Sequence, residues 1–311
     1  MTPTRKEAFM FAGMKSRVSP TSRPRRSVAR SASAALLALA VVGGLLSSCS
    51  SGESAESSTS TTEKSAQSST SAVAAESQTL RILVSNDDGY AAPGIDAVVR
   101  ALAALPDTQV VVAAPAENQS GTAGKTSQGE LQVSEVTTAS GYPATSVQGY
   151  PADAVNWALD GGIGELPALV VTGVNAGQNL GSVGNTLSGT IGAARAAAAK
   201  NIPALASSTA ISDAADYDLA ASYVVKWVQA HRQDLLEGKL TGKELVLQNL
   251  NVPVCTAGSL RAQVEVPMSG SGEGAIADQD CTSTLQDPAD DITAFNNGFV
   301  TLSEVTVQAP A

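Results

Sequence analysis

Aromatic residues and histidine are scarce in this chain of 311 residues. Phe, Trp and Tyr make up 4% of it, against 43% hydrophobic residues in all, so the core must consist mainly of aliphatic side chains. The single histidine, His231, lies in KWVQAHRQDLL, a predicted helix. With no ligand partners at helical spacing it is interpreted as structural, and a Ser-His-Asp triad and an H-E-x-x-H zinc site are excluded.

Two other absences narrow the function further. The sequence has no GxxxxGK[ST] loop and no GxGxxG after a strand, so the motifs of nucleotide motors and dinucleotide enzymes are missing. Basic residues are also rare from residue 49 onward, where 11 basic and 28 acidic residues give a net charge of −17. Such a surface repels nucleic acid polymers, and it repels a small phosphate ester unless a cation lies in the site.

The apolar run AALLALAVVGGLL, residues 34–46, is too short for a comfortable membrane span and matches the length of a signal-peptide core. It follows a basic segment and ends in LSSC, which resembles the bacterial lipobox with Cys49 as the lipidated residue. The alternative is an ordinary cleaved signal with a chance cysteine. We therefore predict a lipoprotein-type signal peptide at 1–48, export, and a lipid anchor on the extracytoplasmic face of the cell membrane.

The segment after this signal is Ser/Thr-rich with few apolar residues. Residues 49–79 cannot bury enough surface to offset their chain entropy, so they are predicted to form a disordered tether to one folded domain at 80–311. Within that domain, Cys255 and Cys281 favour a disulfide if the protein is exported. A reactive thiol is the alternative, but it has no histidine near it in the sequence.

From residue 80, apolar runs alternate with amphipathic segments, which is the pattern of right-handed βαβ units in a parallel sheet. Strands are predicted at 81–85, 109–115, 130–148 (a pair), 168–175, 203–207, 244–253 and in the final stretch, and helices at 94–105, 151–162, 188–200 and 214–235. Ligands of such sheets bind beyond the carboxyl ends of the strands. The chemistry is therefore expected where the turns NDDG, AENQSG and GVNAGQN converge.

The first of these turns places two carboxylates side by side. Asp87 and Asp88 follow a buried strand, and Gly89 relaxes the turn so that both can point to one place. Two ionised carboxylates so close need a positive charge between them or a proton on one of them. With oxygens from Ser120 and Asn175 they would suit Mg²⁺, Mn²⁺ or Ca²⁺. The alternative makes Asp87 a turn residue or N-cap and Asp88 a solvated neighbour.

A second set of polar residues precedes the Ala-rich helix. Asn179, Ser188, Gly189 and Thr190 lie in or beside a predicted helix start, where backbone N–H groups and the helix dipole favour an anion. A metal site next to an anion cradle is what phosphoryl transfer requires. Plain N-capping by Ser188 or Thr190 is the alternative.

These motifs, taken in order, resemble the SurE family of 5′-nucleotidases and acid phosphatases. The resemblance covers about residues 80–210 through SNDDGYAAPGI, VVAAPAENQSG, YPADAV, GVNAGQNLG, SGTIGAA and IPALASS, and more loosely FNNGFVTLSEV. It implies a Rossmann-like three-layer α/β sandwich with a mostly parallel sheet. It also implies a metal-dependent phosphomonoesterase that acts on nucleoside monophosphates, usually as a dimer or tetramer.

The resemblance implies roles for the same residues. The divalent metal, Mg or Mn, would be held by Asp87, Asp88, Ser120 and Asn175. Phosphate contacts would come from Asn179, Ser188, Gly189 and Thr190, and Asp87 or Asp88 would act in catalysis, Asp87 as base or as nucleophile.

The chain also departs from the family pattern. The loop SVGNTL lacks the acidic and aromatic residues often found there, Tyr90-Ala91 is unusual, and 255–285 is not recognisable. Family members are often cytoplasmic, whereas the leader argues for export. A rival interpretation from another functional class is an exported lipoprotein that captures a small ligand in the same crevice without turnover.

Overall fold

The computed structural model describes residues 78–308. The predicted signal peptide at 1–48, the predicted lipidation site Cys49 and almost all of the predicted tether at 49–79 lie outside this range. In the part that is described, each helix is too short or too polar to cross a bilayer.

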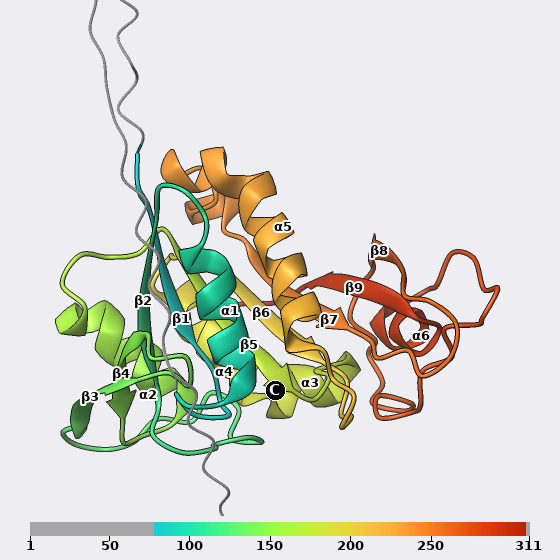
Figure 1. Cartoon of the computed structure of the whole chain (residues 1–311), viewed down its shortest axis with the longest axis horizontal. Helices are drawn as coiled ribbons and strands as arrows, with labels where there is room; N and C mark the ends of the chain where they lie inside the picture. Colours follow the sequence, from blue (N-terminus) through green and yellow to red (C-terminus); the bar gives the residue numbers. More distant parts are fainter. Residues whose placement is uncertain (1–77, 309–311) are drawn as a thin grey trace, which may run out of the picture. The chain divides into compact units, whose positions relative to one another are not determined.

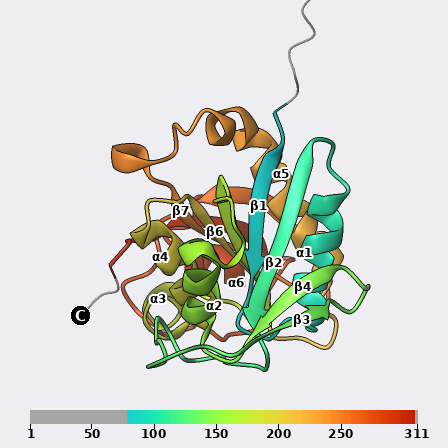
Figure 2. The same cartoon turned by 90° about the vertical axis from the view of Figure 1, so that its left-hand side faces the viewer.

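Nine strands and six α-helices make up the described domain (Figures 1 and 2). The strands are β1 (Leu80–Ser85), β2 (Thr108–Pro115), β3 (Val133–Thr137), β4 (Pro143–Val147), β5 (Leu169–Ala176), β6 (Ala204–Thr209), β7 (Leu247–Val252), β8 (Arg261–Glu265) and β9 (Phe299–Glu304). The helices are α1 (Pro93–Ala103), α2 (Pro151–Trp157), α3 (Gly181–Leu187), α4 (Gly189–Ala199), α5 (Tyr217–Leu236) and α6 (Asp291–Asn296).

All strands join one sheet in the order β3-β4-β2-β1-β5-β6-β7-β9-β8. The neighbours from β4 to β7 are parallel, while β3 pairs antiparallel with β4 and β9 pairs antiparallel with β7. This confirms the predicted α/β class with a mostly parallel sheet. The central strands β1, β5 and β6 are buried almost throughout, as expected for strands covered on both faces.

Helices cover both faces of the sheet, and each face has its own apolar cluster. Ile95 of α1 and Trp227 of α5 pack in one cluster. Val155 of α2 and Ile191 of α4 pack in the other. Figure 2 shows α1 and α5 on one side of the strands and α2 and α4 on the other. The arrangement is the predicted three-layer sandwich.

Two short helices were not predicted, α3 and α6. The α3 sequence GSVGNTL contains two glycines, an asparagine and a threonine, all poor helix formers, so its helix depends on tertiary contacts. Helix α6 begins after Asp290, whose side chain accepts the N–H of Thr293. The predicted helix at 151–162 keeps its α-helical geometry only to Trp157 and closes with a wider turn in which Gly161 has φ +113°.

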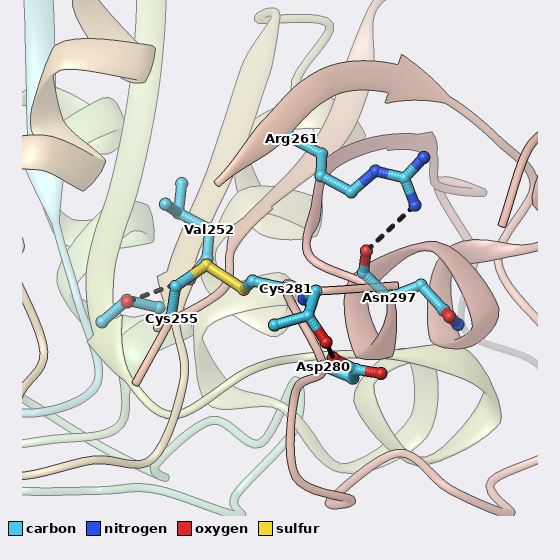
Figure 3. The surroundings of a disulfide bond; sticks show 8 residues. Val252, Cys255, Arg261, Asp280, Cys281 and Asn297 are labelled. Atoms are coloured by element: carbon cyan, nitrogen blue, oxygen red, sulfur yellow. Dashed lines mark hydrogen bonds between the residues drawn. A yellow bond between two sulfur atoms is a disulfide. The ribbon is translucent and has the colours of Figure 1, made fainter. Parts of the chain in front are cut away.

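A long connection, the C-terminal segment (residues 253–298), joins β7 to β9 and includes β8 and α6 (Figure 1). The structure joins Cys255 to Cys281 across it, with a Cα–Cα distance of 5.6 Å (Figure 3). The Arg261 guanidinium also donates to the Asn297 carbonyl, 3.4 Å away, as drawn in the same view. The segment is thus cross-linked rather than built around a large core.

The buried carboxylate of Asp291 fastens this segment to the rest of the domain. It is 0% exposed, and its two oxygens accept backbone N–H groups of Gly181 and Ser269, each at 2.8 Å. Ser182 N–H donates to the Ser271 carbonyl beside it at 3.0 Å. The start of α3 is therefore held by residues about 90 to 110 positions later in the chain.

Candidate metal and phosphate site

The crevice at the carboxyl end of β1 is where the sheet order changes direction. β1 pairs with β2 on one side and with β5 on the other, so the chain turns away in opposite directions from this point. Open α/β sheets bind ligands at such a switch point. Each of the three predicted turns leaves β1, β2 or β5 at this edge, and this brings distant parts of the sequence together.

The acidic turn after β1 is closed by Asn86. Its Nδ2 donates to the Gly89 carbonyl at 2.8 Å, and Gly89 N–H donates back to its Oδ1 at 3.2 Å. Gly89 has φ +100°, and a Cβ on it would lie 3.3 Å from the Glu117 carbonyl carbon, so glycine suits the position on both counts. These two hydrogen bonds between Asn86 and Gly89 fix the turn that holds Asp87 and Asp88 at the sheet edge.

Asp87 lies beneath the start of α4 and is 2% exposed. Its Oδ1 accepts the hydroxyl of Thr190 at 2.6 Å, and a Cβ on Gly189 would lie 2.9 Å from the Asp87 Cβ. Burial raises the pKa of Asp87 to about 6; the Thr190 hydrogen bond opposes this shift, and the Asp88 charge adds to it. The carboxylate is held in place, but without a full complement of donors.

Asp88 connects the other two turns. Its Oδ1 accepts Asn118 Nδ2 at 2.9 Å, and its Oδ2 accepts the backbone N–H of Ala176 at 3.0 Å. Burial raises the pKa of this carboxyl too, against those hydrogen bonds. The salt bridges of the described residues leave both Asp87 and Asp88 without a Lys, Arg or His partner within 4.0 Å.

A cavity of about 140 Å³ opens over Asp87. The predicted site residues that line it are Asp87, Ser120, Asn175, Asn179 and Ser188, and the other lining residues are Gly121, Gln178, Leu180, Val183, Gly184, Leu187, Ala275 and Ile276. Asp88 does not line the cavity, but it is hydrogen-bonded to Asn118 and Ala176, which lie beside Ser120 and Asn175 in the sequence. Gly189 and Thr190 of α4 contact Asp87. The structure thus gathers all the predicted metal and phosphate residues around one place.

Asn175 presents an oxygen to this place. Its Nδ2 donates to the Gly177 carbonyl at 2.6 Å, so the donor end of the amide is used and Oδ1 is the end left for a ligand. The approach of β5 to β6 that positions it requires Gly173, since a Cβ there would lie 2.1 Å from the Ser207 carbonyl oxygen.

The predicted phosphate residues are of two kinds in the structure. Ser188 is the N-cap of α4, and its hydroxyl accepts the Ile191 N–H at 3.0 Å, which is the capping role given above as the alternative. The same residue also lines the cavity. Thr190 is 0% exposed and donates its hydroxyl to Asp87. Asn179 Nδ2 lies 2.9 Å from Ser208 Oγ and 3.3 Å from Thr190 Oγ1. The Asn179 and Thr190 side chains therefore support Asp87.

Sequence reasoning missed several supporting residues. Asn118, which holds Asp88, lies within the quoted AENQSG turn, so that motif contained the signal. Asn249 and Asn251 of β7 donate to the Asn179 carbonyl at 2.7 and 3.2 Å. Two asparagines at alternate positions of a buried strand were the available signal, because buried amides need partners. Asp291 had no local signal.

The donor set fits a hard divalent cation. Asp87, Asp88, Ser120 and Asn175 offer oxygen only, and both carboxyls carry pKa values raised by burial with no basic side chain beside them. A cation would compensate that charge. A metal that prefers sulfur or imidazole has no matching ligands here: His231 is stacked on Trp227 of α5, ring centroids 4.1 Å apart, and its Nδ1 lies 2.8 Å from the Trp227 carbonyl oxygen.

Comparison with known families gives one match that spans most of the domain. The model of a family described as "Survival protein SurE" matches residues 82–271. The chain is 38% identical over 184 residues to the 5′-nucleotidase SurE of Methanopyrus kandleri, covering 56% of this chain and 66% of that protein. For the protein of the same name from Natranaerobius thermophilus the identity is 34% over 189 residues, covering 58% and 70%.

A solved structure shares the fold. The crystal structure of the SurE protein from Aquifex aeolicus superposes with a TM-score of 0.58 at 22% identity, covering 74% of this chain and 94% of that one. The alignment with the Methanopyrus relative spans just under two thirds of that protein's length. The matched family region stops within the C-terminal segment, so β9 and α6 lie beyond it.

Proposed function

This chain belongs to the SurE family, and from that membership and the geometry of the site we propose that it is a metal-dependent phosphomonoesterase acting on nucleoside 5′-monophosphates. The observation that carries the proposal is the carboxylate pair at the switch point, Asp87 buried and Asp88 half-buried, which lacks a basic partner among the described residues. The relatives from Methanopyrus kandleri and Natranaerobius thermophilus, both called 5′-nucleotidase SurE, support the reaction and substrate class.

Four side chains would hold the cation: Asp87, Asp88, Ser120 and Asn175. A bound Mg²⁺ or Mn²⁺ would polarise a phosphoryl oxygen and lower the pKa of a coordinated water. The protein's own part is to fix the ligands. Thr190 orients the Asp87 carboxylate, Asn118 and the Ala176 N–H orient that of Asp88, and Asn175 is oriented by its bond to the Gly177 carbonyl.

The phosphoryl group would lie at the start of α4. The first N–H groups of a helix have no helical acceptors, and the dipole there favours negative charge. Gly189 and Thr190 contribute those N–H groups, and Ser188 and Asn179 line the cavity above. Asp87, oriented by Thr190, is placed to act as base or as nucleophile, with water or a carboxylic acid to protonate the leaving group.

A chelation assay tests the metal. Purified protein is assayed with p-nitrophenyl phosphate and AMP before and after EDTA, then after adding back Mg²⁺ or Mn²⁺. We expect activity to vanish on chelation and to return with the metal. Equal activity after EDTA would refute the metal requirement, and no turnover with any metal would refute the enzyme.

The rival proposal is a binding lipoprotein that uses the same crevice without turnover. Asp87→Ala separates the two: an enzyme loses turnover but keeps some ligand affinity, whereas a binding protein has no turnover to lose. Measuring both AMP binding at equilibrium and AMP turnover for the wild type and Asp87→Ala distinguishes the enzyme from the binding protein.

We propose in addition that the protein is exported and held at the extracytoplasmic face of the cell membrane through Cys49. The leader sequence and the Cys255–Cys281 disulfide support an oxidising compartment. Fractionation of cells that express the wild type and Cys49→Ala is the test: the wild type should be in the membrane fraction and the variant released. Assembly as a dimer, proposed from the family, is tested by sedimentation.

A further inference from the structure

Exposed aliphatic side chains gather at the mouth of the cavity. Of the eight large hydrophobic residues that are exposed in the described part of the chain, three line this one cavity: Val183, Leu187 and Ile276. Their exposed fractions are 42%, 55% and 79%. Single exposed apolar residues are common on protein surfaces, but a cluster beside a polar site marks a contact with an apolar ligand or partner.

A fourth exposed side chain, Ile211, joins them through Gln178. The Gln178 Oε1 accepts the Ile211 N–H at 2.9 Å, and its Nε2 donates to the Ala275 carbonyl at 3.1 Å. Gln178 therefore ties the residues after β6 to the C-terminal segment at the cavity mouth. We call Val183, Leu187, Ile211 and Ile276 the aliphatic rim.

The rim continues directly into the polar floor of the site. The residues that line the cavity include the polar floor, Asp87, Ser120 and Asn175, and every rim residue except Ile211, with no aromatic ring and no Lys or Arg among them. Tyr217 lies near Asp88, and burial, together with the Asp88 charge, raises the pKa of this tyrosine. Tyr217 does not line the cavity, however. A nucleobase would find no stacking partner in this wall, whereas a hydrocarbon group would cover its exposed methyl groups.

We propose that the aliphatic rim gives the protein a further activity, the hydrolysis of phosphate monoesters whose leaving group is an alkyl chain or a comparable apolar group. This rests on the proposed phosphatase function. The phosphoryl group would occupy the polar floor, and the alkyl chain beyond its first two carbons would lie against Leu187 and Ile276. An alkyl group is proposed as the occupant because Leu187 and Ile276 line the same cavity as the polar floor.

A series of straight-chain substrates tests the rim. The kcat/KM values of the metal-loaded wild type are measured for ethyl, butyl and hexyl phosphate and for AMP. We expect a rise of about twofold for each methylene, or about sixteenfold over the four methylenes from ethyl to hexyl phosphate, because the rim covers one side of the chain.

Two rim variants and one matched control locate the effect. Leu187→Ser and Ile276→Ser should each lower kcat/KM for hexyl phosphate by about fivefold and leave ethyl phosphate within about twofold. Leu166 is the control, because it is 56% exposed like Leu187 at 55% but precedes β5 at the opposite end of the sheet. Leu166→Ser should change neither substrate.

Each contrary result has its own meaning. If ethyl, butyl and hexyl phosphate are hydrolysed equally well, the rim inference is wrong and the phosphatase proposal stands. If no phosphate ester is hydrolysed with any metal, both are wrong. If Leu187→Ser lowers kcat/KM for AMP as much as for hexyl phosphate, the rim holds a nucleoside. If the series is flat and Leu187→Ser dissociates an oligomer in sedimentation, the rim is a subunit interface.

Discussion

The parallel half of the domain (residues 80–209) and the C-terminal segment (residues 253–298) contribute to the same cavity by different means. In the parallel half, buried strands end in short turns, and each turn places a polar side chain at the sheet edge. In the C-terminal segment, a disulfide, one buried carboxylate and a six-residue helix hold a mostly irregular chain, which adds Ala275 and Ile276 to the wall.

This difference assigns the catalytic chemistry to the parallel half and the selection of the leaving group to the C-terminal segment. Carboxylates that hold a cation need rigid placement, and strand ends in a buried sheet supply it. The wall beside the leaving group needs only shape and polarity, so a cross-linked loop is enough. Changes in the parallel half should therefore alter the reaction, and changes in the C-terminal segment should alter stability and substrate choice.

Asp87→Ala should have the largest effect on the reaction. Removing this carboxylate takes away a metal ligand and the group placed to act as base or nucleophile, so kcat/KM should fall by about a thousandfold or more. Stability should fall little or even rise, because a buried charge without a basic partner disappears. Phosphatase assays and urea unfolding of the same preparation measure both. A variant that keeps a tenth of the activity would remove Asp87 from the mechanism.

Breaking the disulfide should give the opposite profile. Cys255 and Cys281 are 26 residues apart, and loss of a cross-link of that size costs about 3 kcal/mol of stability. The Cys255→Ser/Cys281→Ser variant should unfold at lower urea concentration yet hydrolyse ethyl phosphate within about threefold of the wild type, since the metal ligands lie in the parallel half. Wild type unfolded in the presence of dithiothreitol is the control, because reduction breaks the same cross-link without a substitution. An unchanged unfolding midpoint would contradict the idea that the disulfide holds the segment.

The same contrast explains how much the sequence could predict. Strand ends are local signals: Asp87 and Asp88 follow one apolar run and Asn175 ends another, so their meeting followed from the parallel topology alone. Asp291 binds Gly181, 110 residues earlier, and nothing near either residue indicates that contact. Helix α3 was missed for the same reason, because its weak helix formers are stabilised by distant partners rather than by their own propensity.

Thr190 was predicted to contact phosphate, and only the packing showed its hydroxyl turned to Asp87. Sequence spacing places a residue on a helix or strand, but it does not show whether its hydroxyl donates to a ligand or to a neighbouring side chain. The aliphatic rim was equally out of reach, because Leu187 and Ile276 are 89 positions apart and lie in segments without a regular pattern.

A second buried aspartate in the parallel half provides a comparison with Asp87. Asp96 accepts hydrogen bonds from Thr138 at 2.6 Å, from Ser140 N–H at 2.8 Å and from Ser140 Oγ at 2.7 Å. Burial alone would raise its pKa, but these bonds and one from Arg100 outweigh it and lower the pKa to about 2. A carboxylate with enough donors needs no cation, and the hydrogen bonds of Asp96 supply them.

Stability should therefore depend on Asp96 in acid. The folded pKa is about 2 and the unfolded value 3.8, so the stabilisation is complete above pH 3.8 and is lost as the pH falls toward 2. Asp96→Asn should cost about 2 kcal/mol at pH 7 and nearly nothing at pH 2, with kcat unchanged at pH 7. Asp213→Asn is the control, because that side chain is exposed and takes no part in the salt bridges of the described residues. Equal losses of stability at pH 7 and pH 2 would mean that ionisation of Asp96 does not cause the effect.

The smallest expected effect tests whether Thr190 supports Asp87. Thr190→Val keeps the shape of a residue that is 0% exposed but removes the hydroxyl that donates to Asp87 Oδ1. Loss of a partner that orients a ligand should weaken Mn²⁺ binding by about tenfold, and Thr190→Ser should restore most of it because the donor returns. Calorimetric titration of the metal reports this independently of turnover. Wild-type Mn²⁺ affinity in Thr190→Val would mean that the hydroxyl does not position the carboxylate. The contribution of α4 to the site would then come from its backbone N–H groups alone.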